Sequence, residues 1–393
     1  MKKVLSLSII FCFVLVLFAC TGTPLTPETD RQFLTAPEAF RWQDCVPGFL
    51  ETPWGEYQNV SDMEKDLVYF SPAGEQTFYV LCGKPDCTHN DENCNAYGAL
   101  ALGYYNEHLY FVRSSDKGTH VLARMNKDGT EHTDIAELPV GVNKITGATV
   151  SGGEYRFHNG QLIIVSVIPE GFGEYIRPMY KIDLETGDAV SLFDAFLSEY
   201  VVCGYKAFGD TLYMDCEKKD TASETQNHVL AAGDLQTEEI RILFEDWPAY
   251  GGIPPVEKDG VLYYHLPGKG YYEYDLSVGT EELKLSADLY LSQTSYANQY
   301  IFARELSKAD IGENEYVSNL LPWRFCVYDY GYNLVDTLSF EGFVYKPNLL
   351  FVTNDALYFS AGGGNKITHY AEIGKIGTGD FRLIPIGTSW SSR

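Results

Sequence analysis

Basic residues are scarce in this chain of 393 residues, because 29 Lys and Arg stand against 54 Asp and Glu and leave a formal charge of −25. That charge repels phosphate backbones and anionic lipid headgroups, which excludes a nucleic-acid binder and a basic membrane-surface protein. Common enzyme motifs are also absent: the sequence contains no G-x-S-x-G elbow, no Walker phosphate loop and no H-E-x-x-H helix. Hydrolase, nucleotide-binding and zincin functions therefore have no support from motifs.

Only one long apolar run is present, and it lies near the first residue. The run covers residues 4–19 and follows the basic residues Lys2 and Lys3. It is shorter than the roughly 20 apolar residues of a membrane-spanning helix, and serines interrupt it near its start. A basic start followed by a short apolar run predicts a secretory signal. It ends in Leu17-Phe18-Ala19-Cys20, which resembles the bacterial lipobox, where a signal peptidase cuts before a cysteine that then carries a diacylglycerol thioether. Phe18 departs from that pattern, which usually has a smaller residue there. The alternative is an ordinary signal without a lipid.

Residues 21–40 are rich in Thr and Pro and show no hydrophobic alternation, which is typical of a linker. We therefore predict a signal peptide over 1–19, a lipidated tether over 20–45 and a folded domain over 46–393. The lipid on Cys20 would hold this lipoprotein at the cell membrane on the extracellular side.

A short apolar or aromatic phrase recurs along the predicted domain. Its centres are Tyr69, Tyr110, Ile163, Tyr213, Tyr263, Ile301 and Tyr358, about 48 residues apart on average. Turn pairs near the phrases favour tight hairpins, as at Asn159-Gly160, Gly209-Asp210, Asp259-Gly260 and Asn354-Asp355. Further strands follow the phrases, as at 121–125, 179–183, 271–275 and 325–329. With the extended linker, each unit makes four strands, so the sequence predicts an all-β, seven-bladed β-propeller, with six or eight blades as alternatives.

The turn Asn126-Lys127-Asp128-Gly129-Thr130 is similar to the repeats of TolB-like propellers, and the chain from about residue 60 to 390 resembles lipid-anchored β-propellers of bacterial surfaces. The segment from Leu81 to Ala96 also looks like a signature of uncharacterised lipoproteins from Gram-positive anaerobes. These resemblances imply a fold, and they imply no mechanism, because propellers host many functions.

Seven of nine cysteines remain once one leaves with the signal and Cys20 takes the lipid. Export favours disulfides, although an anaerobic habitat would weaken that expectation. A hairpin that turns at Gly209-Asp210 pairs residues whose numbers sum to 419, as those of Cys203 and Cys216 do, at a close, non-hydrogen-bonded position. We predict a disulfide between them, with two buried free thiols as the alternative. Cys326, inside a predicted strand, is expected to be a buried small residue.

Four residues of metal-binding type lie close together in the sequence, in the pattern C-x4-C-x-H-x4-C formed by Cys82, Cys87, His89 and Cys94. Their types suit a Cys3His zinc site, but the spacing is not a familiar zinc spacing, and Cys87 and His89 would have to bind from a kinked loop. We expect one or two disulfides that also involve Cys45. A zinc site and free thiols are the alternatives, and no other cofactor is expected.

The connections between the second and third strands of each blade share one face of a propeller, and they vary most in length at 113–119, 169–178, 217–227 and 304–322. Binding residues concentrate on such loops, because a rigid scaffold carries them. The candidate ligand contacts are Arg113, Tyr175, Arg177, Arg304, Trp323 and Arg324.

These observations favour a non-catalytic propeller that binds an unidentified ligand or protein partner at the cell surface. One alternative is a carbohydrate-active enzyme, glycosidase or sialidase-like, which paired carboxylates beside an Arg group at the mouth of the funnel would favour. Only a fragment of the sialidase Asp-box turn is present, at Ser114-x-Asp116-x-Gly118, with His120 where that box has Thr. The other alternative is a scaffold in an envelope complex, which a large exposed apolar patch would favour.

Overall fold

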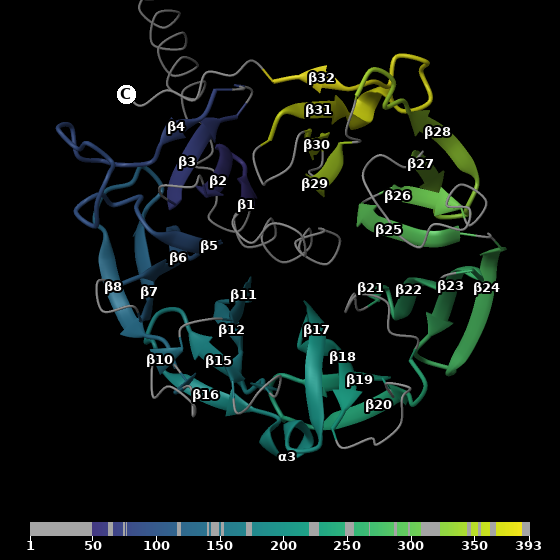
Figure 1. The fold of residues 1–393 in the computed structure, drawn as a ribbon, viewed down its shortest axis with the longest axis horizontal. Helices are drawn as coiled ribbons and strands as arrows, with labels where there is room; N and C mark the ends of the chain where they lie inside the picture. The colour runs from purple at the N-terminus through teal and green to yellow at the C-terminus, as the bar shows by residue number, and fades with distance from the viewer. Residues whose placement is uncertain are drawn as a thin grey trace, which may run out of the picture.

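The structure is a computed structural model. It describes residues 49–61, 66–73, 75, 77–115, 119–139, 141–142, 149–150, 153–169, 175–219, 228–247, 255–266, 268–286, 289–297, 299–307, 323–343, 347–352, 355–361 and 367–386. Seven sheets of four antiparallel strands stand side by side in a ring (Figure 1). The predicted seven-bladed β-propeller is therefore confirmed. None of the described helices is long and apolar enough to cross a membrane.

Each of the first four blades is built from one stretch of chain. Their strands are β1 (Phe49–Thr52), β2 (Gly55–Ser61), β3 (Asp66–Pro72) and β4 (Tyr79–Val80) in blade 1; β5 (Ala99–Tyr105), β6 (His108–Ser114), β7 (His120–Asn126) and β8 (Thr133–Glu137) in blade 2; β11 (Gly153–His158), β12 (Gln161–Ser166), β15 (Met179–Asp183) and β16 (Ala189–Leu192) in blade 3; and β17 (Tyr200–Phe208), β18 (Thr211–Lys218), β19 (His228–Asp234) and β20 (Ile240–Phe244) in blade 4.

The last three blades follow the same order. Their strands are β21 (Val256–Lys258), β22 (Val261–Leu266), β23 (Gly270–Asp275) and β24 (Thr280–Ser286) in blade 5; β25 (Leu289–Ala297), β26 (Tyr300–Ser307), β27 (Arg324–Asp329) and β28 (Leu334–Leu338) in blade 6; and β29 (Asn348–Val352), β30 (Ala356–Ser360), β31 (His369–Glu372) and β32 (Ile384–Pro385) in blade 7. The described residues outside the blades add the ribbons β9 (Gly141–Val142) with β10 (Thr149–Val150) and β13 (Ile168–Pro169) with β14 (Tyr175–Ile176), the helix α3 (Asp194–Leu197) and the 3-10 turn η2 (Ile373–Lys375).

The hairpins that open blades 3 and 5 turn where the sequence predicts. His158 pairs with Gln161 around Asn159-Gly160, and Lys258 pairs with Val261 around Asp259-Gly260. Both residues of each turn have positive φ, 46° and 75° in blade 3 and 52° and 80° in blade 5. Positive φ at both positions is the geometry of a two-residue turn that matches the twist of the strands, and Asn, Asp and Gly tolerate it.

The recurring phrase marks the second strand in six blades, but in blade 1 it falls on the third. Tyr69 lies in β3, whereas the second strand of that blade is β2, with the sequence GEYQNVS. This strand has no run of apolar residues, because it buries polar side chains: Gln58 is 0% and Asn59 8% exposed. The first interval between phrases is short for that reason.

Tyrosines form much of the core between blades and bond across the seams with their hydroxyl groups. Tyr57 of blade 1 donates to the Lys127 carbonyl of blade 2 at 2.9 Å, and Tyr271 of blade 5 donates to Glu305 of blade 6 at 2.7 Å. Tyr205 of blade 4 lies near two carbonyls of blade 3, at 3.2 and 3.3 Å. All three rings are fully buried. Each ring therefore supplies apolar area and a polar bond to the same seam, as the aromatic-rich phrases suggest.

Side chains close the ring between blade 7 and blade 1, which share no strand among the described residues. Tyr358 of β30 donates a hydrogen bond to Glu56 of β2 at 2.6 Å, and its ring lies 6.1 Å from that of Phe49. The rest of the seam is an apolar cluster from both blades. Its buried members are Phe78, Leu350, Ile367 and Ile386.

The predicted pairing of Cys203 with Cys216 is wrong by one residue. The sum of 419 holds from Phe208 with Thr211 up to Gly204 with Asp215, but the next pair is Val202 with Cys216. Cys203 is therefore the extra residue of a β-bulge, which moves its side chain out of register with Cys216. Both thiols are free.

Candidate metal centre

The cysteine-rich segment occupies the edge of blade 1, where the outer strand is cut short. β4 has only two residues, and the chain that follows, 81–98, has no regular strand. It still follows β3, because Val68 donates to the Ala96 carbonyl at 3.0 Å and Leu67 forms an isolated antiparallel bridge with Tyr97. The segment thus covers part of the edge that a longer fourth strand covers in blades 2 to 6. We call residues 81–98 the cysteine loop.

The cysteine loop also bonds to the turn between β7 and β8 of blade 2. The Gly83 amide donates to the Gly129 carbonyl at 3.1 Å, and the Asn95 side chain donates to the same carbonyl at 2.6 Å. A Cβ on Gly129 would lie 2.9 Å from the Leu81 backbone, so glycine is needed for this close approach. The loop therefore links blade 1 to blade 2.

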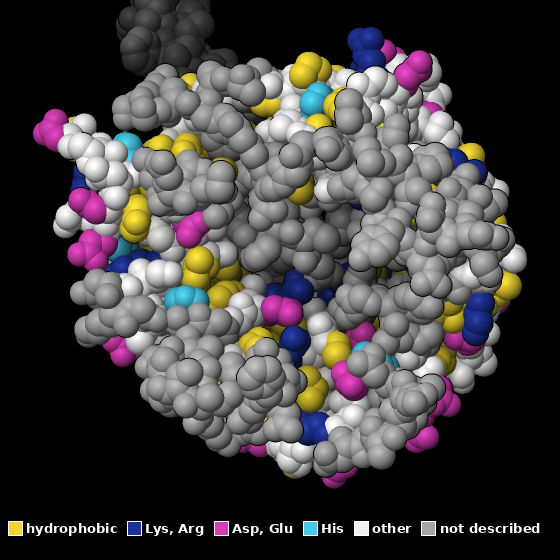
Figure 2. All heavy atoms as spheres, viewed as in Figure 1, with side chains coloured by type: hydrophobic (Ala, Val, Ile, Leu, Met, Phe, Trp, Pro, Cys, Tyr) yellow, Lys and Arg dark blue, Asp and Glu magenta, His cyan; other side chains and the backbone are white. Residues whose placement is uncertain are grey.

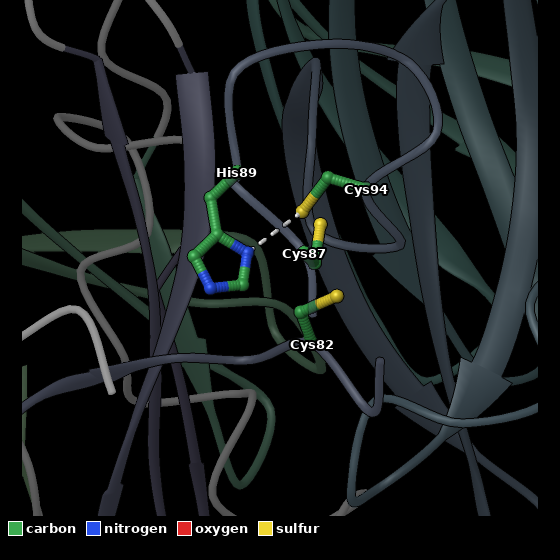
Figure 3. Close-up of side chains that lie close together, drawn as sticks. All are labelled: Cys82, Cys87, His89 and Cys94. Carbon is green, nitrogen blue, oxygen red and sulfur yellow. Dashed lines mark hydrogen bonds between the residues drawn. The ribbon is translucent and has the colours of Figure 1, made fainter. Parts of the chain in front are cut away.

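Four donor atoms converge inside the loop. The Sγ atoms of Cys82, Cys87 and Cys94 and a ring nitrogen of His89 all lie within 4.8 Å of one another. Figure 3 shows the four side chains grouped together, with a contact of 3.4 Å between His89 Nδ1 and Cys94 Sγ. His89 and Cys94 are buried, whereas Cys82 and Cys87 are half-buried.

Local turns bring these residues together despite their unusual spacing. The Cys87 amide donates to the Lys84 carbonyl at 3.2 Å, and the Cys94 amide donates to the Asp91 carbonyl at 3.0 Å, so each of these cysteines ends a tight turn. His89 has a φ of 55°, in the left-handed region. This reversal kinks the chain directly after Cys87, which lets two residues only two apart point to the same centre.

The electrostatics of the cluster differ between its thiols. Burial raises the pKa of the Cys82 thiol, but the backbone N–H groups of Lys84 and Asn95 and the thiols of Cys87 and Cys94 outweigh burial, so this pKa lies below its usual value. Burial raises the pKa of Cys94, and the charge of Cys82 raises it further. Backbone N–H groups directed at a sulfur stabilise a thiolate, which is the form that binds metals.

The cluster has the donors and the size of a tetrahedral zinc site. A zinc ion with Zn–S bonds of about 2.3 Å places neighbouring sulfurs about 3.8 Å apart, so small movements would bring these donors into place. Three thiols and an imidazole fill all four positions, as in structural zinc sites. Cys82, Cys87 and Cys94 are free, contrary to the expected disulfides, and the suggested partner Cys45 lies outside the described residues.

The ligand contacts suggested by the sequence lie near the ends of strands, but the structure spreads them over three blades. Arg113 is paired within blade 2, since its Nε and Nη2 donate to Asp134 at 2.9 and 2.5 Å. Arg304 and Trp323 meet in blade 6, with the guanidinium carbon 4.2 Å from the ring centroid. Burial lowers the pKa of Arg304 to about 10, so it stays charged at neutral pH.

The other three candidates have different positions and contacts. Arg177 donates to the Val202 carbonyl at 2.8 Å and so bridges blade 3 to the bulge in blade 4. Arg324 is exposed at the start of β27, and nothing is described of the Tyr175 side chain. The Asp-box fragment also lies outside the described residues from Asp116 to Gly118.

Sequence reasoning missed a second group of donors, formed by Cys203, Glu217 and His228, whose ligand atoms lie within 4.8 Å of one another. Glu217 and His228 flank the connection between β18 and β19 and are paired across these strands. That pairing follows from the antiparallel hairpin and was available as a signal. The bulge at Cys203 had only a weak signal, the glycine at position 204 inside the strand.

Charges of both signs show on the ring face drawn in Figure 2. Acidic side chains stand around the rim, and Lys and Arg side chains also appear near the centre of the ring, beside acidic ones. Cys326, expected to be a buried small residue, is buried and places its Sγ 3.4 Å from Glu305. It therefore takes part in the polar seam between blades 5 and 6.

Comparison with solved structures agrees with the propeller fold. The structure is similar to a prolyl endopeptidase with a TM-score of 0.52 and 12% identity, over 90% of this chain and 51% of that one. An acylaminoacyl peptidase matches with a TM-score of 0.49 and 11% identity, over 91% of this chain and 53% of that one. The chain thus spans about half the length of these two peptidases, and the likeness to the prolyl endopeptidase, at 12% identity, shows the fold alone. No family model matches the sequence, and no curated protein matches it.

Proposed function

We propose that this chain is a lipid-anchored, extracellular binding propeller whose cysteine loop is fixed by a structural zinc ion. The observation that carries the metal is the convergence of three free thiols and a buried imidazole within 4.8 Å. Four protein donors leave no open position for a substrate, so the ion would serve structure and not catalysis.

A zinc ion would supply what the cysteine loop lacks in secondary structure. A segment of this length without strands or helices is uncommon in a compact domain. Ordering it costs conformational entropy, and without regular secondary structure few backbone hydrogen bonds offset that cost. Coordination of a metal by four residues along the loop would offset this entropy cost. The ion would thereby complete the edge of blade 1 and hold its contact with Gly129 of blade 2.

The binding role rests on the scaffold, because binding residues concentrate on loops that a rigid scaffold carries. Arg304 and Trp323 are only 4% and 7% exposed and contact each other, so they support the end of blade 6 from within and do not present a surface to a ligand. The enzyme alternative has less support. Asp215 and Glu217 form a pair of carboxylates near Arg177, but Asp215 is fully buried and bonded to His228 at 2.8 Å, which keeps it from a sugar substrate.

The scaffold alternative would need a large apolar patch. The exposed large hydrophobic residues of the described chain lie on or beside the outer strands of four different blades, which favours isolated positions over one patch. They are Val190, Ile242, Val278, Leu283, Leu334 and Val335.

The metal content tests the zinc site. We expect Cys87→Ser to lower the zinc bound per purified chain by about one equivalent, because a structural site seldom survives the loss of one of four ligands. Cys326→Ser is the matched control, since it removes a thiol that lies far from the cluster in sequence and belongs to blade 6. Elemental analysis of both variants measures the difference. Equal zinc in Cys87→Ser and the parent protein would contradict the proposed site.

The anchor is tested separately at Cys20. We expect the native protein to begin at this residue and to carry a diacylglycerol thioether, and we expect Cys20→Ser to move the protein from the membrane fraction to the soluble exported fraction. Mass spectrometry of the amino-terminal peptide and fractionation of cells measure both. An unmodified Cys20 in the native protein, or cleavage elsewhere, would rule out the lipid anchor and leave the zinc site unaffected.

A further inference from the structure

The β-bulge in β17 changes the direction in which the Cys203 side chain points, compared with a regular strand. Asp215 and Glu217 lie two apart on β18 and so share one face, whereas Cys216 points to the other, where it joins the apolar core. The bulge places Cys203 with Glu217 and His228. Bulges that re-aim a side chain are frequent next to functional sites.

Groups from three strands and a neighbouring blade surround this position. His228 lies opposite Glu217 in the register of β18 and β19, and its Nδ1 is 2.8 Å from Asp215. Arg177 of blade 3 holds the bulge through the Val202 carbonyl. The arrangement is therefore fixed by backbone pairing and by a bond from the adjacent blade.

Asp215 supplies a second, independent indication of a ligand. Its side chain is 0% exposed, and its Oδ2 has no hydrogen-bond partner among the described residues. Burying a carboxylate oxygen without a partner is costly unless a positive charge lies near it. Arg177 contributes some positive charge in this region, but it donates to a carbonyl and not to Asp215.

We propose that Cys203, Glu217 and His228 form a second metal site, which binds a divalent transition metal such as zinc, with Asp215 as the carboxylate that orients His228. Thiolate, carboxylate and imidazole are all zinc ligands, and a metal-binding histidine commonly directs its other ring nitrogen to a carboxylate. Three protein ligands leave a fourth position open, in contrast to the closed set in the cysteine loop. The open position would take water or an anionic group of a bound molecule.

A metal explains the group better than a cysteine nucleophile does. A nucleophilic thiolate needs positive surroundings, yet Glu217 and Asp215 both bring negative charge to Cys203. A divalent cation between these groups would turn their mutual repulsion into coordination and would offset the charge of the buried Asp215. The proposal is independent of the zinc in the cysteine loop, because it uses other residues in another blade.

Zinc binding to the exported full-length chain tests the site. We would dialyse the parent protein, Cys203→Ala and Glu217→Gln against buffered free zinc and measure bound metal per chain. Each variant is expected to bind about one equivalent less than the parent protein at a free zinc concentration that saturates the parent. Glu239→Gln, at an exposed position between β19 and β20, is the matched control and should bind as the parent does.

Cobalt substitution provides a readout that depends on the ligand set. Cys203→Ala should remove one thiolate contribution to the cobalt charge-transfer absorption, whereas Cys87→Ser should reduce the stronger absorption of the other site. The circular dichroism spectrum checks that each variant is folded, and Glu217→Gln alters a half-buried side chain by a single group, so it keeps the test open if Cys203→Ala unfolds. Full zinc binding by a folded Glu217→Gln together with an unchanged cobalt spectrum would overturn the proposal. Loss of metal in these variants but not in Cys87→Ser would support this site and refute the other.

Discussion

Chelation of the metal proposed for the cysteine loop is expected to accelerate cleavage after Glu92 by about 1,000-fold, if the free metal beforehand exceeds its dissociation constant by about the same factor. Glu92 is exposed, but a protease needs an extended segment, and the turn that ends at Cys94 holds this stretch closed. Cleavage through a transiently opened loop follows the population of the open form, which metal removal raises. Digestion with a glutamate-specific protease, followed by mass spectrometry, measures the rate.

Two alanine variants distinguish the loss of a metal ligand from the loss of a buried side chain. Cys94 and Cys216 are both buried thiols, 2% and 0% exposed, so Cys94→Ala and Cys216→Ala remove the same atoms from similar surroundings. Cys94→Ala should be cleaved rapidly with or without a chelator, whereas Cys216→Ala should keep the slow rate and the response to the chelator. If the chelator leaves the rate at Glu92 unchanged in the parent protein, the loop is held without a metal.

Raising the pH from about 5 to about 8 is expected to destabilise the ring through Glu56 by about 2.5 kcal/mol. Burial at the seam between blades 1 and 7 raises the pKa of Glu56 from 4.5 to about 7, against the opposing effect of the Tyr358 hydrogen bond. Between pH 4.5 and about pH 7, Glu56 is therefore protonated in the folded protein and ionised in the unfolded chain. This contribution is complete below about pH 4.5 and is lost as the pH rises through about 7.

Glu56→Gln should remove this pH dependence, since the amide stays neutral and can still accept from Tyr358 at its oxygen. Denaturant unfolding at several pH values measures the free energy of unfolding, and the variant should be more stable than the parent at about pH 8 and similar at about pH 5. Glu239→Gln, exposed, is the control and should follow the parent at every pH. A parent curve that rises between these pH values while Glu56→Gln runs parallel to it would contradict the raised pKa.

Local sequence signals were enough to predict the blades. The turns at Asn159-Gly160 and Asp259-Gly260 need positive φ, and the residues that tolerate it are visible in the sequence, so hairpin positions and much of the register follow from neighbours. Blade 1 escaped the pattern because its second strand buries Gln58 and Asn59 in place of apolar residues. Polar burial depends on partners elsewhere in the fold, which a hydrophobic pattern does not register.

The candidate sites were less accessible to sequence reasoning. The residue types in the cysteine loop indicated a metal, but only a positive φ at His89 shows how Cys87 and His89 reach one centre. The second group depends on a single inserted residue at Cys203, and the sequence signal for it is weak: Gly204 follows Cys203, and a glycine inside a strand indicates a bulge without fixing its position. Arginines chosen for their loop positions turned out to bond to their own scaffold, as Arg113 does to Asp134.

The closure of the ring by side chains also determines the order in which the molecule assembles. Every blade is made of neighbouring strands, so each one forms through contacts between residues close in sequence, whereas the bond from Tyr358 to Glu56 joins residues 302 positions apart. Contacts between residues far apart in sequence cost the most conformational entropy, and they therefore form late in folding. We therefore expect folding to pass through an open arc of folded blades, in which blade 1 and blade 7 do not yet touch. The contact between blade 7 and blade 1 then forms last. If one of these blades took a strand from the opposite terminus, that blade could not fold before the ring closed.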